Sequence, residues 1–133
     1  HRAIEPSTED IAESLRHFGE KFLAFLYSPE VRAHRHLAIS ESGRTELGRL
    51  LYERGVLRSQ NLISEFLQAA MTLGKLRQAE PDVATKHFCA LLESELLDRF
   101  LFRVLGELGT EEIKGVAARA IDVFMAAYGP RPA

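Results

Sequence analysis

The stretch TEDIAESLRHFGEKFLAFLYSPE, residues 8–30, decides the fold class of this chain. Its apolar residues recur three or four positions apart, at Ile11, Leu15, Phe18, Phe22 and Leu26. This spacing places them on one face of a helix, which predicts a helix with one buried side. Ser7 and Asp10 have the spacing of a capping box at its start. The segment Ser28-Pro29-Glu30 ends this helix and begins the next, because proline disfavours helix in the preceding residue and fits the first helical position.

The rest of the chain continues with helical patterns separated by glycines and prolines. We expect further helices over about residues 29–43, 45–52, 57–73, 81–105 and 110–128. Thr45 can cap the third helix and Gly55 can close it, while Gly74 and Gly106 follow the fourth and fifth. No segment alternates apolar and polar residues long enough to predict a strand. The sequence therefore predicts one all-α domain of about six helices over residues 1–133.

Composition excludes several classes of protein. The formal net charge of −2 does not favour a nucleic-acid binder. Cys89 is the single cysteine, so an internal disulfide is impossible and nothing indicates secretion. No apolar run approaches the roughly 20 residues of a membrane span. We expect a cytoplasmic protein without membrane contact. Because the chain opens with histidine and not methionine, we also expect a fragment or a processed product.

The last two predicted helices carry apolar residues on more than one side. The core of one domain can cover one side of such a helix, and a partner chain can cover another. We expect a homodimer in which these helices form a four-helix bundle, two from each chain. The candidate interface residues are Leu97, Leu101, Val104, Val116, Ala120, Val123, Phe124 and Ala127.

Patterns for metal binding and catalysis are weak. His34 and His36 are two positions apart, which separates them by about 200° on a helix, so they cannot chelate one ion together. Cys89 lies inside a predicted helix among apolar residues, where a thiol is inert. A Gly-x-Ser-x-Gly nucleophile motif is absent. We therefore expect no catalytic residue, no metal and no cofactor, while a single histidine ligand joined by distant residues stays open.

Four segments in order resemble a known family: SPEVRAHRHLAISES (28–42), TELGRLLYERG (45–55), LGKLRQAEPDVATKHF (73–88) and EEIKGVAARAIDVFMAAYG (111–129). Together they look like the C-terminal, effector-binding and dimerisation domain of TetR-family transcriptional regulators, of the AefR-like type. The resemblance covers nearly the whole chain. Nothing in these residues resembles the N-terminal helix-turn-helix of that family. The resemblance therefore implies that DNA is contacted only through a module absent from this sequence.

In the resembled fold, the second, fourth and fifth predicted helices frame a cavity in the middle of the domain. We expect a small hydrophobic or amphipathic effector there, bound by Phe18, Phe22, His34, Leu37, Glu41, Phe66, Ala70, Phe88, Leu92 and Glu95. Simpler interpretations stay open for each residue. The aromatic residues also fit a packed core, Glu41 also fits a pair with an arginine, and His34 fits a surface position. Glu95 with Arg99 also fits a buried pair that crosses the subunit interface, or an exposed helix pair.

The resemblance implies the sensing half of a bacterial transcriptional regulator and not an enzyme. Effector binding would favour one of two arrangements of the helices and so change DNA binding by the missing module. Two other functions remain open from the residues alone. One is a helical-bundle enzyme or cofactor carrier, and the other is a plain helical interaction module with a packed interior.

Overall fold

The computed structural model describes residues 10–130, and all regular elements in this range are helical. They are α1 (Ile11–Leu26), α2 (Pro29–Glu41), α3 (Leu47–Leu51), the π-helical turn η2 (Tyr52–Val56), α4 (Leu57–Thr72), α5 (Pro81–Glu93), α6 (Leu97–Leu101) and α7 (Thr110–Tyr128). The prediction of an all-α fold is confirmed. No helix within residues 10–130 is long and apolar enough to cross a membrane.

Local capping explains where the first two helices begin. Asp10 caps α1, and its carboxylate accepts a hydrogen bond from the backbone N–H of Glu13 at 3.0 Å. Ser7, the other residue of the expected capping box, lies outside the described residues. At the next boundary, the Ser28 hydroxyl accepts from the N–H of Val31, and Pro29 occupies the first turn of α2. The predicted boundary between the two helices is confirmed.

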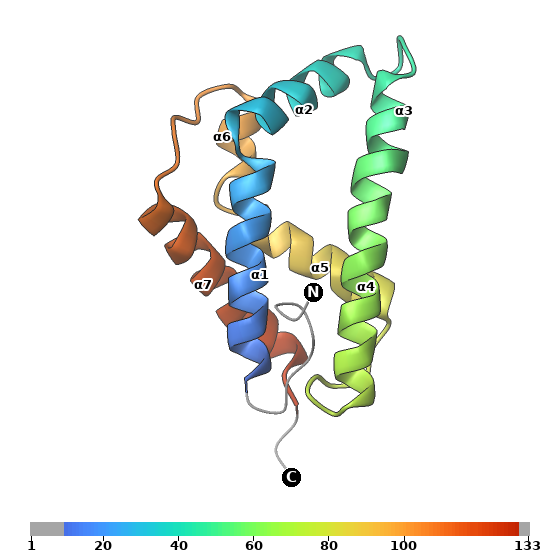
Figure 1. Ribbon diagram of the computed structural model, residues 1–133, viewed down its shortest axis with the longest axis vertical. Coiled ribbons are helices and arrows are strands. Elements are labelled where there is room, and N and C mark those ends of the chain that lie inside the picture. Colours follow the sequence, from blue (N-terminus) through green and yellow to red (C-terminus); the bar gives the residue numbers. More distant parts are fainter. Residues whose placement is uncertain (1–9, 131–133) are drawn as a thin grey trace.

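Gly55 does not close the third helix, contrary to the prediction. Residues 47–72 form one continuous rod in which α3 passes through η2 into α4 (Figure 1). The backbone N–H of Leu57 donates to the carbonyl of Tyr52, five residues earlier, so the chain stays hydrogen-bonded through the turn. Counted as continuous rods, the described residues contain six helices.

The predicted helix over residues 81–105 is also wrong in its second half. α5 ends at Glu93, and after a tight turn the short α6 begins at Leu97. On either side of the start of α6, Leu96 and Phe100 are both fully buried in the core. The guanidinium of Arg32 holds the segment that follows α6 by donating to the backbone carbonyls of residues 105 and 106. These contacts between distant residues outweigh the local helical pattern.

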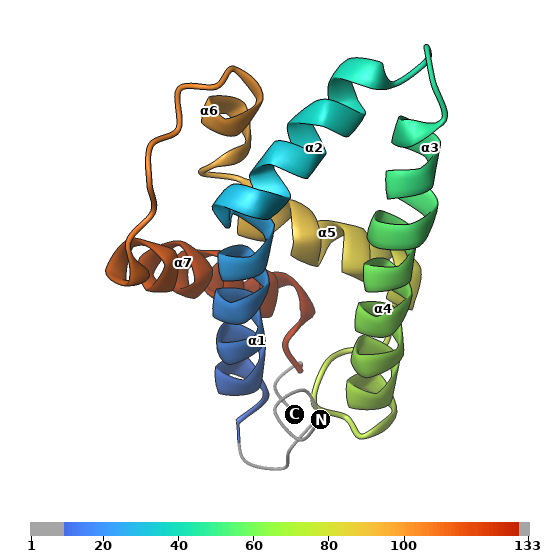
Figure 2. The same ribbon diagram turned by 45° about the horizontal axis from the view of Figure 1, so that its top comes forward.

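The helices are arranged around two upright elements. Figures 1 and 2 show α1 and α4 standing on either side, α5 crossing between them, and α2 running from the upper end of α1 to α3, at the top of the rod that contains α4. α7 packs across α1 and alongside α5. The largest fully buried side chains include Leu15, Leu23, Leu67, Phe88, Leu92, Phe100 and Phe124. The candidate site lies where residues of α1, α4 and α5 line a cavity.

Candidate functional site

An apolar cavity of about 230 Å³ lies between α1, α4 and α5. We call it the aromatic cavity, and it is lined by Leu15, Phe18, Phe22, Phe25, Ser59, Leu62, Ile63, Phe66 and Phe88. The rings of Phe18 and Phe22 stack at 5.5 Å between centroids, and the ring of Phe88 lies 6.1 Å from Phe18. Only Ser59 contributes a polar side chain to the lining. Such a surface suits a flat apolar molecule.

A second cavity of about 250 Å³ adjoins the first. We call it the polar cavity, and it is lined by Phe22, Phe25, Leu26, Val31, His34, Arg35, Leu51, Gly55, Val56, Ser59, Gln60, Cys89 and Glu93. Phe22, Phe25 and Ser59 line both cavities. Each volume alone falls slightly below the roughly 300–1,000 Å³ typical of small-molecule sites, and a ligand that occupied both would reach that range.

An ion pair between α2 and α5 forms one wall of the polar cavity. The guanidinium of Arg35 donates to Oε1 of Glu93 at 2.8 Å, and the hydroxyl of Tyr27 donates to the same oxygen. Both charged side chains are largely buried, with 15% and 20% of their surface exposed. The guanidinium also lies over the ring of Phe100, 4.3 Å from its centroid. These contacts hold the pair in one geometry, because a buried charge must keep its partners.

Burial raises the pKa of two groups near this pair, the Tyr27 hydroxyl and the Cys89 thiol. Removal from water, reinforced by the Glu93 carboxylate, raises the pKa of the Tyr27 hydroxyl above its usual range. The same two causes raise the pKa of the Cys89 thiol to about 11. At neutral pH the thiol is therefore protonated and is a poor nucleophile. Within residues 10–130, no group of three or more histidine, cysteine or acidic side chains could hold a metal ion.

A third hollow opens between α2 and the α3–η2 segment. This groove of about 330 Å³ is lined by His34, Leu37, Ala38, Leu47, Leu50, Leu51, Arg54 and Gly55. His34, Leu51 and Gly55 also line the polar cavity, so they form the boundary between the two. Leu37, a predicted ligand contact, lies in this groove and not in the aromatic cavity.

The structure brings five of the predicted ligand contacts together. Phe18, Phe22, Phe66 and Phe88 line the aromatic cavity, and His34 lines the polar cavity. Ala70 and Leu92 line none of the three hollows. Both are fully buried in the core instead.

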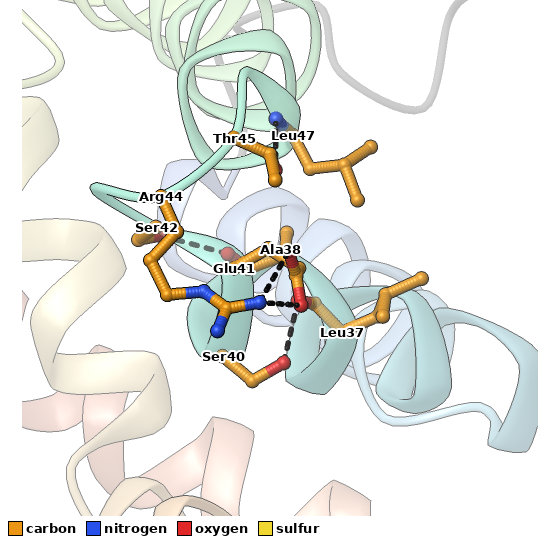
Figure 3. Close-up of polar contacts among 8 residues, drawn as sticks. All are labelled: Leu37, Ala38, Ser40, Glu41, Ser42, Arg44, Thr45 and Leu47. Atoms are coloured by element: carbon orange, nitrogen blue, oxygen red, sulfur yellow. Dashed lines mark hydrogen bonds and ion pairs between the residues drawn. The ribbon is translucent and has the colours of Figure 1, made fainter.

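Two predicted acidic contacts lie outside the three hollows and pair with arginines instead. Glu41, near the end of α2, pairs with Arg44 at 3.0 Å, which is the alternative left open by the sequence (Figure 3). Glu95 binds Arg119 of α7 through two hydrogen bonds of 2.8 Å. The expected side-chain pair between Glu95 and Arg99 is wrong, since Arg99 donates to the backbone carbonyl of Glu95. The reason is the end of α5 at Glu93, which turns the Glu95 side chain towards α7.

Sequence reasoning missed Phe25, Ser59, Arg35 and Glu93 as lining residues. Phe25 lies seven positions after Phe18, so helical spacing alone carried a signal for it. Arg35 and Glu93 are 58 positions apart and lie on different helices. No local pattern connects them.

The predicted interface residues fall into two groups. Leu97, Leu101, Val104, Val123 and Ala127 are exposed. Val116, Ala120 and Phe124 are buried within the chain, because that side of α7 packs on α1 and α5. Their assignment to an interface is therefore corrected: they belong to the core of the chain.

Solved structures similar to this chain include the following three. A protein from Mesorhizobium loti, assigned to the TetR family of transcriptional regulators, has a TM-score of 0.86 at 22% identity over 93% of this chain. A TetR transcriptional regulator from Agrobacterium tumefaciens has a TM-score of 0.78 at 27% identity over 96%. The flavonoid-responsive regulator FrrA has a TM-score of 0.76 at 28% identity over 91%. The matched part is 62% of the length of each of these proteins.

A search of curated proteins found no similar sequence. A family profile, in contrast, matches most of the chain. The profile described as AefR-like transcriptional repressor, C-terminal domain, matches residues 13–130, which include every helix of the structure from the first turns of α1 to the end of α7. The chain therefore belongs to the family of C-terminal domains of AefR-like transcriptional repressors.

Proposed function

We propose that this chain is the part of a transcriptional regulator that binds a small aromatic effector and forms the dimer. The observation that carries the proposal is the aromatic cavity, which adjoins a polar cavity through Phe22, Phe25 and Ser59. A molecule with a flat apolar body and a polar group fits this combination. One structure similar to this chain is that of a flavonoid-responsive regulator, and flavonoids are flat aromatic compounds with polar groups.

The effector acts by favouring one arrangement of the helices. Phe18 and Phe22 belong to α1, whereas Phe66 belongs to α4, so a molecule between them fixes how these helices sit relative to each other. DNA is bound by a helix-turn-helix module outside these residues, in the cytoplasm, and the position of α1 communicates the state of the cavity to that module. The regulator acts by binding and not by catalysis.

Dimerisation uses the exposed side of α5 and α7. The two helices lie antiparallel, since the ring of His87 contacts that of Tyr128 and Glu95 binds Arg119. Their exposed residues therefore form one surface, which includes the apolar residues Val83, Ala90, Val123, Ala126 and Ala127. We call it the α5–α7 face. Two such faces packed about a two-fold axis make a four-helix bundle.

Substitution of Ser59 by phenylalanine tests the position of the effector. Ser59 lines both cavities, so an added ring fills the space where they meet. We expect Ser59→Phe to weaken the binding of 2-naphthol, or of a flavonoid, by at least about tenfold in calorimetric titrations. Asn61→Phe is the matched control, because Asn61 is an exposed residue of the same helix. Equal affinity of Ser59→Phe and the unmutated chain, or no binding of either compound to the unmutated chain, contradicts the proposed site.

A further inference from the structure

The charges that line the polar cavity largely cancel. Arg35 and Glu93 form a pair with 2.8 Å between the guanidinium and the carboxylate, and each is mostly shielded from water. The other ionisable side chains of the lining are the exposed imidazole of His34 and the protonated thiol of Cys89. The aromatic cavity has no charged residue in its lining. The Arg35–Glu93 pair in the lining of these cavities therefore carries no net charge.

Arg35 and Glu93 already bind each other, and one oxygen of the Glu93 carboxylate accepts both of its hydrogen bonds. Both hydrogen bonds that Glu93 accepts from residues 10–130 reach Oε1, from Arg35 and from Tyr27, which leaves Oε2 to accept another. The side chains of Ser59 and Gln60 also line the cavity and make no hydrogen bond to another group within the described part of the chain. The wall thus offers neutral donors and acceptors together with one remaining carboxylate oxygen.

Building on the proposed function, we propose that this site selects effectors whose polar group is an uncharged hydroxyl and rejects carboxylates. A hydroxyl donates to Oε2 of Glu93 without disturbing the ion pair. A carboxylate is repelled by Glu93, and one that contacts the guanidinium of Arg35 must lie close to the Glu93 carboxylate that this guanidinium already binds. Two carboxylates would then share one cation in a poorly hydrated space, where like charges repel strongly.

Three compounds with the same bicyclic ring separate these requirements. They are 2-naphthol with a neutral hydroxyl, 2-naphthoic acid, which is ionised at neutral pH, and 2-methylnaphthalene with no polar group. In calorimetric titrations of the unmutated chain, we expect 2-naphthol to bind at least about tenfold more tightly than 2-naphthoate. We expect 2-methylnaphthalene to bind, but more weakly than 2-naphthol.

The Glu93→Gln variant tests the cause of the preference. Glutamine keeps the shape and can still accept from Tyr27, but it leaves the charge of Arg35 unbalanced. We expect 2-naphthoate to gain affinity by at least about tenfold, so that the preference for 2-naphthol is lost or reversed. Glu95→Gln is the matched control, since Glu95 lies outside the cavities and pairs with Arg119 on the surface. This control should retain the preference of the unmutated chain.

The outcomes distinguish this inference from the proposed function. Equal binding of 2-naphthol and 2-naphthoate to the unmutated chain overturns the selection of a hydroxyl while leaving an aromatic effector site in place. That comparison needs no variant, so it holds even when Glu93→Gln does not fold. A folded Glu93→Gln protein with an unchanged preference overturns the role of Glu93. Failure of all three compounds to bind overturns the proposed effector site itself.

Discussion

Replacement of Val123 by arginine is expected to convert a dimer of this chain into monomers. Val123 is 53% exposed in the single chain and lies near the middle of the α5–α7 face, so an arginine there keeps its charge in water in the monomer. In the dimer the same charge would be buried against apolar residues of the partner without a counter-ion. We expect dimerisation to weaken by at least about 100-fold. The free energy of unfolding of the monomer should change by only about 0.5 kcal/mol.

Sedimentation at micromolar concentration measures this effect. Gln68→Arg is the control, because it adds the same charge at an exposed position of α4, away from the α5–α7 face. The control should sediment as the unmutated dimer does. A Val123→Arg protein that remains dimeric contradicts the position of the interface. An unmutated chain that sediments as a stable monomer contradicts dimerisation of these residues by themselves.

Phe88→Ala is expected to produce the largest loss of stability. Phe88 is fully buried and borders the aromatic cavity, and its ring meets Phe124 of α7 edge-on at 5.3 Å and Phe18 of α1 at 6.1 Å. It therefore joins the core of the chain to the wall of the site. Loss of a buried phenylalanine ring lowers the free energy of unfolding by about 3–5 kcal/mol, through lost burial and the cavity left behind.

Urea unfolding followed by circular dichroism measures this loss. Phe102→Ala is the control, since 77% of the surface of Phe102 is exposed in the single chain. Both substitutions are measured together with Val123→Arg, so that the protein is monomeric. In that background, Phe102→Ala should change the free energy of unfolding by about 0.5 kcal/mol or less. A loss below about 1 kcal/mol for Phe88→Ala in the same background contradicts the packing of α5 between α1 and α7.

The sequence predicted correctly those helices whose ends depend on neighbouring residues in the chain. Ser28 and Pro29 separate α1 from α2 through capping and the geometry of proline, and α7 spans the expected residues. Two elements depended on interactions that the local sequence does not contain. Gly55 stays helical because a π-helical turn keeps its backbone bonded, and α5 ends early because residues beyond it pack on α1 and α2.

Helical spacing and the family resemblance together predicted part of the candidate site. The spacing of Phe18 and Phe22 placed them on one stripe of α1, and the resemblance placed that stripe beside the cavity. The same reasoning failed for Phe124, since the sequence of a helix with two apolar sides does not say which side its own chain covers. Arg35 and Glu93 are polar residues that meet only in the folded chain.

A single tryptophan in the aromatic cavity tests the central claim most directly. The chain has no tryptophan, so Phe66→Trp introduces one fluorophore into the wall of the cavity. Leu73→Trp places the same fluorophore at an exposed position just after α4. We predict that titration with 2-naphthol changes the emission of Phe66→Trp in a saturable way and leaves that of Leu73→Trp without a saturable response. Equal responses of the two variants, or no saturable response of Phe66→Trp, would contradict an effector site between α1, α4 and α5.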